Sequence, residues 1–137
     1  MARSLGNVVL LVHHRSMSAS FIESTLLNAV PSFRDDWTLL RGAWSSEEAP
    51  STAHFLASLR VHLISRLQDG DAVAFTRLAQ TIERLLGEAD PILEELLVDH
   101  LVMPLARESA SAGVRRALVE PHLGRRMRAV WDERADS

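Results

Sequence analysis

Three successive leucine-rich segments between Ser51 and Arg107 constrain what this chain can fold into. In each of them the apolar residues recur every three or four positions, which is the period of one face of an α-helix. Gly70, Gly87 and the pair Asp90-Pro91 separate the segments. Connections this short make neighbouring helices run antiparallel. No segment has convincing strand periodicity, so the sequence predicts an all-α fold.

Capping and breaking residues divide the chain into predicted helices, because Ser, Thr and Asp favour helix starts while Gly and Pro favour helix ends. The first five run from Ser20 to Pro31, from about Ser32 to Arg41 or Trp44, from Ser51 or Thr52 to Gly70, from Asp71 to Gly87, and from Asp90 to Pro104. A loop is expected from Glu108 to Gly113. The remainder divides at Glu120-Pro121 into a short helix holding Val114 and Leu118 and a helix that begins near Gly124.

These helices predict one domain over residues 17–134, preceded by an N-terminal arm at residues 1–16. For the arm, disorder and a short strand or helical turn packed on the domain stay as alternatives. Two consecutive hairpins also raise the idea of a two-repeat α-solenoid. Because no sequence repeat of fixed period is visible, we expect an irregular bundle of about six helices built from antiparallel hairpins, with the solenoid as the alternative.

Composition narrows the class of protein. The chain has no cysteine, which excludes a disulfide scaffold, a thiolate zinc site and a cysteine nucleophile, and favours a cytoplasmic location. No stretch approaches the ~20 apolar residues of a membrane span. The net charge of −3 gives no reason to expect binding to nucleic acid or to an anionic membrane. All fifteen basic residues are arginine, which we interpret as the codon bias of a GC-rich bacterial genome.

Residues that could carry chemistry are few. The chain has no Gly-x-Ser-x-Gly turn and no phosphate-binding glycine loop. Its histidines lack the spacing of a metal site, so we predict neither an enzyme nor a bound metal or cofactor. One enzymatic alternative stays open, a metal-assisted hydrolase that uses His62, Asp99 and His100.

Charge is distributed unevenly along the chain. Residues 69–99 carry eight acids against two arginines, and residues 107–128 carry six arginines against two acids. Surfaces of opposite sign can steer oppositely charged partners, although they can also neutralise each other within the fold. The predicted partner-binding residues are Asp90, Glu94, Glu95, Asp99 and, as a surface aromatic anchor, Trp44. A secondary basic face would comprise Arg115, Arg116, Arg125, Arg126 and Arg128.

Three segments carry a resemblance to a known kind of domain: Phe21 to Phe33, Asp71 to Glu95, and Leu123 to Trp131. Over about residues 17–133 the chain resembles a family of small, uncharacterised, all-helical bacterial domains of unknown function. The matching positions are mainly core and turn residues. An acidic residue that the family carries near Met103-Pro104 is missing here. The resemblance implies the helical fold, and some such domains resemble immunity or accessory proteins encoded near toxins.

Taken together, these features predict a non-enzymatic interaction domain, most concretely a bacterial immunity protein that binds and occludes a toxin. Besides the metal-assisted hydrolase, the alternative is a self-associating adaptor or regulator, such as a homodimer formed through the Arg115–Arg128 face.

Overall fold

The computed structural model describes residues 20–43 and 51–135, and every regular element in these ranges is helical, as predicted. The first helix covers residues 20–29. It is followed by η1 (Pro31–Phe33), α2 (Arg34–Ala43), α3 (Thr52–Gln68), α4 (Val73–Glu88), α5 (Pro91–Leu97), η2 (Val98–Val102), α6 (Met103–Ser111), α7 (Arg116–Val119), η3 (Glu120–His122) and α8 (Arg125–Ala135). The predicted arm at residues 1–16 lies outside the described residues, as does Trp44.

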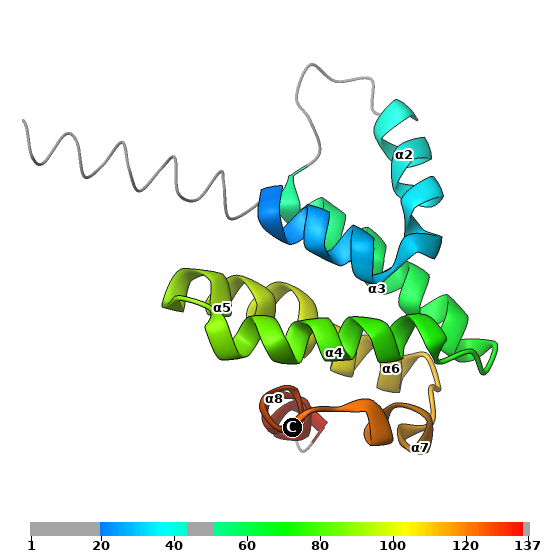
Figure 1. Cartoon of the computed structure of the whole chain (residues 1–137). Helices are drawn as coiled ribbons and strands as arrows, with labels where there is room; N and C mark the ends of the chain where they lie inside the picture. Colours follow the sequence, from blue (N-terminus) through cyan, green and yellow to red (C-terminus); the bar gives the residue numbers. More distant parts are fainter. Residues whose placement is uncertain (1–19, 44–50, 136–137) are drawn as a thin grey trace, which may run out of the picture.

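The helices pack in three tiers (Figure 1). α4 and the continuous run α5–η2–α6 form the middle tier. α3 packs on one side of this pair and α8 on the other, so the middle helices are covered on both faces. Helix 20–29 lies beside α3, and α2 rises from its end at the top right of Figure 1. The arrangement is the predicted irregular bundle.

Two helix starts follow directly from local sequence. The Ser51 side chain accepts a hydrogen bond from the His54 N–H (3.2 Å) at the start of α3. The Asp90 carboxylate accepts one from the Leu93 N–H (2.8 Å) at the start of α5. Both bonds satisfy backbone donors that a helix leaves unpaired in its first turn. The predictions for these two starts are confirmed.

Two glycines end helices in the left-handed conformation that other residues rarely adopt. Gly70 has φ +82° and Gly113 has φ +80°. After Gly70 the Asp71 N–H bonds the Arg66 carbonyl at 2.9 Å, and after Gly113 the Val114 N–H bonds the Ser109 carbonyl at 3.0 Å. These six-to-one bonds close the helix end and reverse the chain. The predicted stop at Gly70 is confirmed.

Several predicted boundaries were wrong. The short helix expected to hold Val114 and Leu118 begins at Arg116, so Val114 lies before it. α4 continues through Gly87 to Glu88, and a Cβ at Gly87 would lie 3.4 Å from the guanidinium carbon of Arg126, so this glycine leaves space for a neighbouring side chain. The expected loop at residues 108–113 is shorter, because α6 continues to Ser111.

The sequence predicted a helix end at Pro104, but the helix continues through this residue to Ser111. Proline has no N–H to donate to the carbonyl of residue 100. The preceding turn is a π-helix, in which the Met103 N–H bonds the Val98 carbonyl. The carbonyl left by Pro104, that of His100, instead accepts a hydrogen bond from Arg60 of α3 at 2.6 Å. A side chain from another tier therefore gives the His100 carbonyl a donor where the helix contains a proline.

Arg60 also fixes the segment after Pro104. Its Nε and Nη2 atoms bond the two carboxylate oxygens of Glu108 at 3.0 and 3.2 Å. The Arg60 side chain is only 15% exposed. A bidentate pair that is partly buried is stronger and more specific in direction than a fully solvated one. Arg60, on α3, thus bonds both the π turn and the helix that follows it.

The core contains two aromatic clusters. Phe33, Trp37 and Phe55 pack together near α3, with the Trp37 and Phe55 ring centroids 4.9 Å apart in an edge-to-face arrangement. Phe75 and Trp131 pack at 5.8 Å and join α4 to α8. Trp37 and Trp131 are both 4% exposed. Their helical spacing had predicted that both would lie in the core.

The start of α8 is capped from another helix. The Glu83 carboxylate of α4 accepts hydrogen bonds from the N–H groups of Arg126 (2.9 Å) and Met127 (3.0 Å). Gly124 makes this approach feasible, because a Cβ there would lie 2.4 Å from Glu83 Oε1. Glu83 therefore acts as a long-range helix cap that fixes α8 on α4.

Candidate functional site

A groove of about 360 Å³ runs along α5 and η2 and reaches the start of α3. It is lined by Thr52, Ile92, Leu93, Glu95, Leu96, Asp99 and His100. Two of the predicted partner-binding acids, Glu95 and Asp99, therefore lie beside three aliphatic side chains. We call this surface the α5–η2 groove.

Helical spacing explains the composition of the groove. Ile92, Glu95, Leu96 and Asp99 follow one another at intervals of three, one and three residues, which places them on one face of the helix. Ile92 is 39% exposed, a large fraction for an isoleucine of this fold. The sequence analysis missed Ile92 as a groove residue, although the same spacing already linked it to Glu95 and Asp99.

The acids of this region differ in their roles. Asp90 caps the start of α5, as described above. Glu94, Glu95 and Asp99 are exposed and form no ion pair with any other residue in the ranges 20–43 and 51–135. Glu94 does not line the groove. The α5–η2 region therefore carries carboxylates whose charge is not compensated by the described part of the chain.

The predicted basic face is partly neutralised by internal ion pairs. Arg116 pairs with Glu120 at 3.3 Å and also with Asp132. Arg128 pairs with Glu120 at 3.2 Å. These contacts raise the pKa of Arg116, first through its hydrogen bond to Asp132. The two acids compensate the positive charge of Arg116 within the fold.

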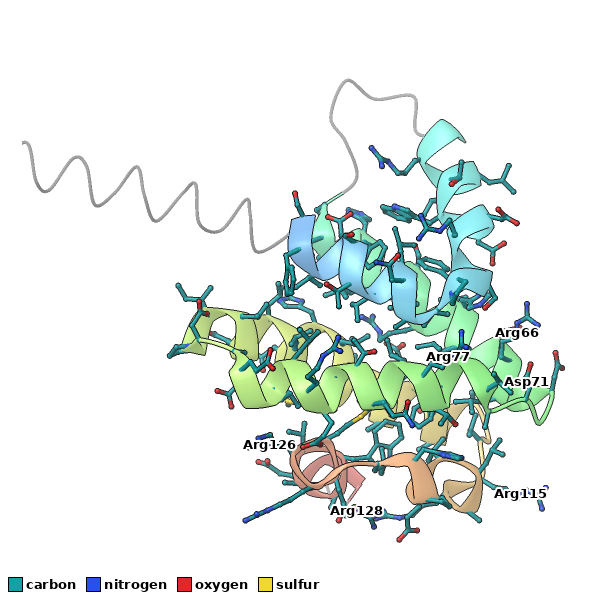
Figure 2. The ribbon with its side chains drawn as sticks, viewed as in Figure 1. Arg66, Asp71, Arg77, Arg115, Arg126 and Arg128 are labelled. Atoms are coloured by element: carbon teal, nitrogen blue, oxygen red, sulfur yellow. The ribbon has the colours of Figure 1, made fainter. Side chains whose placement is uncertain are left out.

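The remaining arginines of that face do not gather into one patch. Arg126 pairs with Glu83 at 3.3 Å. Arg115 and Arg125 are exposed and form no ion pair within the described ranges. Figure 2 shows Arg115 at the opposite end of the lower tier from Arg126. Charge compensation within the fold thus accounts for three of the five arginines.

His62 does not line the α5–η2 groove, and its contacts are with other residues. It is 8% exposed and packs on the Phe33 ring with the centroids 5.4 Å apart. Its Nε2 lies 2.9 Å from Ser32 Oγ and its Nδ1 lies 3.0 Å from Asp36 Oδ2. Sequence reasoning missed this cluster, because its members are separated by 26 and 30 residues.

The structure does not bring His62, Asp99 and His100 into one site. Asp99 and His100 line the α5–η2 groove, whereas both ring nitrogens of His62 are engaged by Ser32 and Asp36. Among the described residues, no group of three or more His, Cys, Asp or Glu side chains could hold a metal ion.

Other exposed apolar side chains are scattered over the surface. The large exposed apolar residues in the described ranges are Phe21, Leu39, Val61, Val73 and Ile92. Only Ile92 lines the α5–η2 groove. Of the helices in the described ranges, none has both the length and the apolar character needed to cross a bilayer.

Comparison with known proteins identifies a family but no individual relative. No curated protein and no solved structure matches this chain. A family model does match, over residues 23–136, and it therefore includes α2 to α8 and the α5–η2 groove. The chain belongs to the family described as domain of unknown function DUF7674.

Proposed function

We propose that this domain binds a basic protein partner through the α5–η2 groove, and most concretely that it is a cytoplasmic immunity protein that occludes a toxin. One observation carries the proposal: Glu95 and Asp99, which form no ion pair within residues 20–43 and 51–135, lie beside Ile92, Leu93 and Leu96. Binding of this kind requires no chemistry from the domain itself.

The two kinds of side chain in the groove would have separate effects on binding. Aliphatic side chains that leave water on contact supply affinity. Exposed carboxylates speed association with a basic surface and suppress binding to acidic ones, and salt weakens their effect. A toxin that cleaves nucleic acid needs a basic surface, and such a surface would complement Glu94, Glu95 and Asp99.

The experiment begins with affinity capture of the tagged domain from its native lysate at low and moderate salt. The captured partner is then produced separately and titrated against two variants with the same change in net charge. The face variant reverses Glu94, Glu95 and Asp99 to arginine. The control variant reverses three exposed acids on other elements, Asp35, Asp69 and Glu133, none of which forms an ion pair in the described ranges.

We expect the face variant to raise the Kd by at least about tenfold, or ~1.4 kcal/mol, and the control variant to change it far less. Circular dichroism should show the same helix content for both. Equal weakening by the two variants would mean that net charge, and not this groove, determines binding.

A further inference from the structure

Ser32, His62 and Asp36 form a hydrogen-bonded chain in the order that acyl-transfer enzymes use. Ser32 Oγ lies 2.9 Å from His62 Nε2, and Asp36 Oδ2 lies 3.0 Å from His62 Nδ1. The serine and the aspartate come from η1 and α2, and the histidine comes from the middle of α3. Such an arrangement is recognised by the roles of its atoms and not by order in the sequence.

The chemistry of the partners fixes the proton positions. A carboxylate has only acceptor atoms, so the bond to Asp36 requires the proton of a neutral imidazole to lie on Nδ1. Nε2 is then an acceptor, and the Ser32 hydroxyl donates to it. This is the tautomer in which a histidine can remove the proton of a serine.

The surroundings hold the histidine in place and leave the serine accessible. The His62 side chain is 6% exposed and lies against the Phe33 ring, so its orientation is restricted. Ser32 is exposed. The Asp36 side chain is 60% exposed and reaches the imidazole from the solvent side.

Ser32 also lines a pocket of about 240 Å³ whose charged lining residues are two arginines and one acid, Asp71. Arg66, near the end of α3, and Arg77, in α4, line the same pocket (Figure 2). Arg77 forms no ion pair in the part of the chain that the structure describes, and Arg66 has only a loose pair with Asp71 at 4.0 Å. A small anionic molecule in this pocket would meet the guanidinium groups of Arg66 and Arg77, which together outnumber the single carboxylate of Asp71.

We infer that Ser32 is the nucleophile of an esterase site that takes small carboxylic esters bearing an anionic group. Ser32 Oγ would attack the ester carbonyl carbon while its proton passes to His62 Nε2. The bond from carbon to the alcohol oxygen then breaks, and the same proton goes to the departing alcohol. Water attacks the resulting acyl-serine, its proton passes through His62 back to Ser32 Oγ, and the carboxylic acid leaves.

Each residue has a distinct role in this scheme. Ser32 and His62 are catalytic residues, whereas Asp36 is a positioning residue that holds the imidazole tautomer. Arg66 and Arg77 would bind the anionic group of the ester. The inference is independent of the proposed partner binding, because none of these five residues lines the α5–η2 groove.

The test compares hydrolysis of p-nitrophenyl acetate and of the anionic p-nitrophenyl hemisuccinate by the full chain. We expect Ser32→Ala and His62→Asn to lower kcat/KM on the order of 100-fold or more, the usual effect of losing a general base. Asp36→Asn should lower kcat with little change in KM, and Asp36→Glu should restore part of it. Arg66→Met and Arg77→Met should lower the ratio of hemisuccinate to acetate turnover by about tenfold, the order of one ion-pair contact.

The chain supplies a matched control. Ser51 and His54 form another hydrogen-bonded serine–histidine pair, at 2.7 Å, and both residues are exposed. His54→Asn should leave both rates unchanged. A fluorophosphonate probe followed by peptide mass spectrometry should label Ser32 and not Ser51.

The outcomes are decisive even if one variant fails to fold. Ser32→Ala removes a single oxygen, and its melting temperature and circular dichroism show whether the fold is kept. If His62→Asn unfolds, Ser32→Ala and the probe still decide. Unlabelled Ser32 together with Ser32→Ala turnover equal to that of the wild type would overturn the inference and leave the cluster as a purely structural network.

Discussion

Arg60 donates a hydrogen bond to the carbonyl oxygen of His100 at 2.6 Å, across 40 residues of sequence. That carbonyl is the one that Pro104 cannot serve, because proline lacks an N–H. The same guanidinium binds both oxygens of Glu108. One arginine therefore bonds the π turn at His100 and the helix after Pro104 at Glu108. π-helical turns often occur at functional sites, and this one contributes Asp99 and His100 to the α5–η2 groove.

This relationship predicts a coupling between Arg60 and Pro104. Arg60→Met should lower the free energy of unfolding by about 2–3 kcal/mol, since it leaves an unpaired carbonyl and an unpaired Glu108. In a Pro104→Ala background residue 104 regains an N–H, so the same change should cost less. A double-mutant cycle measured by urea unfolding tests this, and additive effects of the two substitutions would contradict it.

Gly124 is predicted to be required for the junction of α4 and α8. Gly124→Ala places a Cβ 2.4 Å from Glu83 Oε1, so the carboxylate must move away from the α8 backbone. Losing this cap should cost about 1 kcal/mol. Gly42→Ala is the control, because a Cβ there meets nothing within 4 Å. Thermal unfolding should show a lower Tm for Gly124→Ala only.

Glu83 is predicted to stabilise the fold in a pH-dependent way. Burial raises the pKa of its carboxyl, but hydrogen bonds from Met127 and Arg126 and the charge of Arg126 outweigh this, and the net pKa is lowered. A carboxyl whose pKa is lowered in the native state stabilises that state at pH values above its unfolded pKa of about 4.3. This stabilisation is lost as the pH falls through the folded pKa. The stability difference between wild type and Glu83→Gln should therefore be larger at pH 7 than at pH 3. A pH-independent difference in urea unfolding would argue against the charge as its cause.

The contribution of Glu23 to stability is predicted to depend on pH in the opposite direction. Its partial burial raises the pKa of the carboxyl more than the Thr52 hydrogen bond and the charge of Arg41 lower it. The ionised form is thus disfavoured in the native state, and wild type should gain stability relative to Glu23→Gln as pH falls from 7 to 4. Chemical unfolding at these two values provides the measurement, and a relative loss on acidification would refute the prediction.

Removing the hydroxyl of Ser109 is predicted to stabilise the protein. Its side chain is 2% exposed and its Oγ atom has no hydrogen-bond partner among the described residues. Ser109→Ala removes an unsatisfied polar atom and inserts a better helix former, so the free energy of unfolding should rise by about 1 kcal/mol. Ser111→Ala on the exposed side of α6 is the comparison. A lower Tm for Ser109→Ala would show that the hydroxyl is satisfied in solution.

The sequence by itself determined the fold class, the two tryptophans of the core and several helix ends. Ser51, Asp90 and Gly70 act within one turn of their own helix, so the bonds they make can be inferred from neighbouring residues. The spacing of Ile92, Glu95 and Asp99 is equally local and indicates one face shared by α5 and η2, although Ile92 was not among the predicted site residues.

Only the tertiary structure decided that α6 continues past Pro104, that Glu83 caps α8 and that Ser32 and Asp36 meet at His62. Each of these depends on side chains that lie between 26 and 48 residues apart. Local propensity places a helix break at a proline, whereas here the helix continues and packing brings Arg60 to the carbonyl of His100. The packing of whole helices determines whether a donor so distant in sequence lies near the carbonyl. Helical periodicity carries no information about that packing.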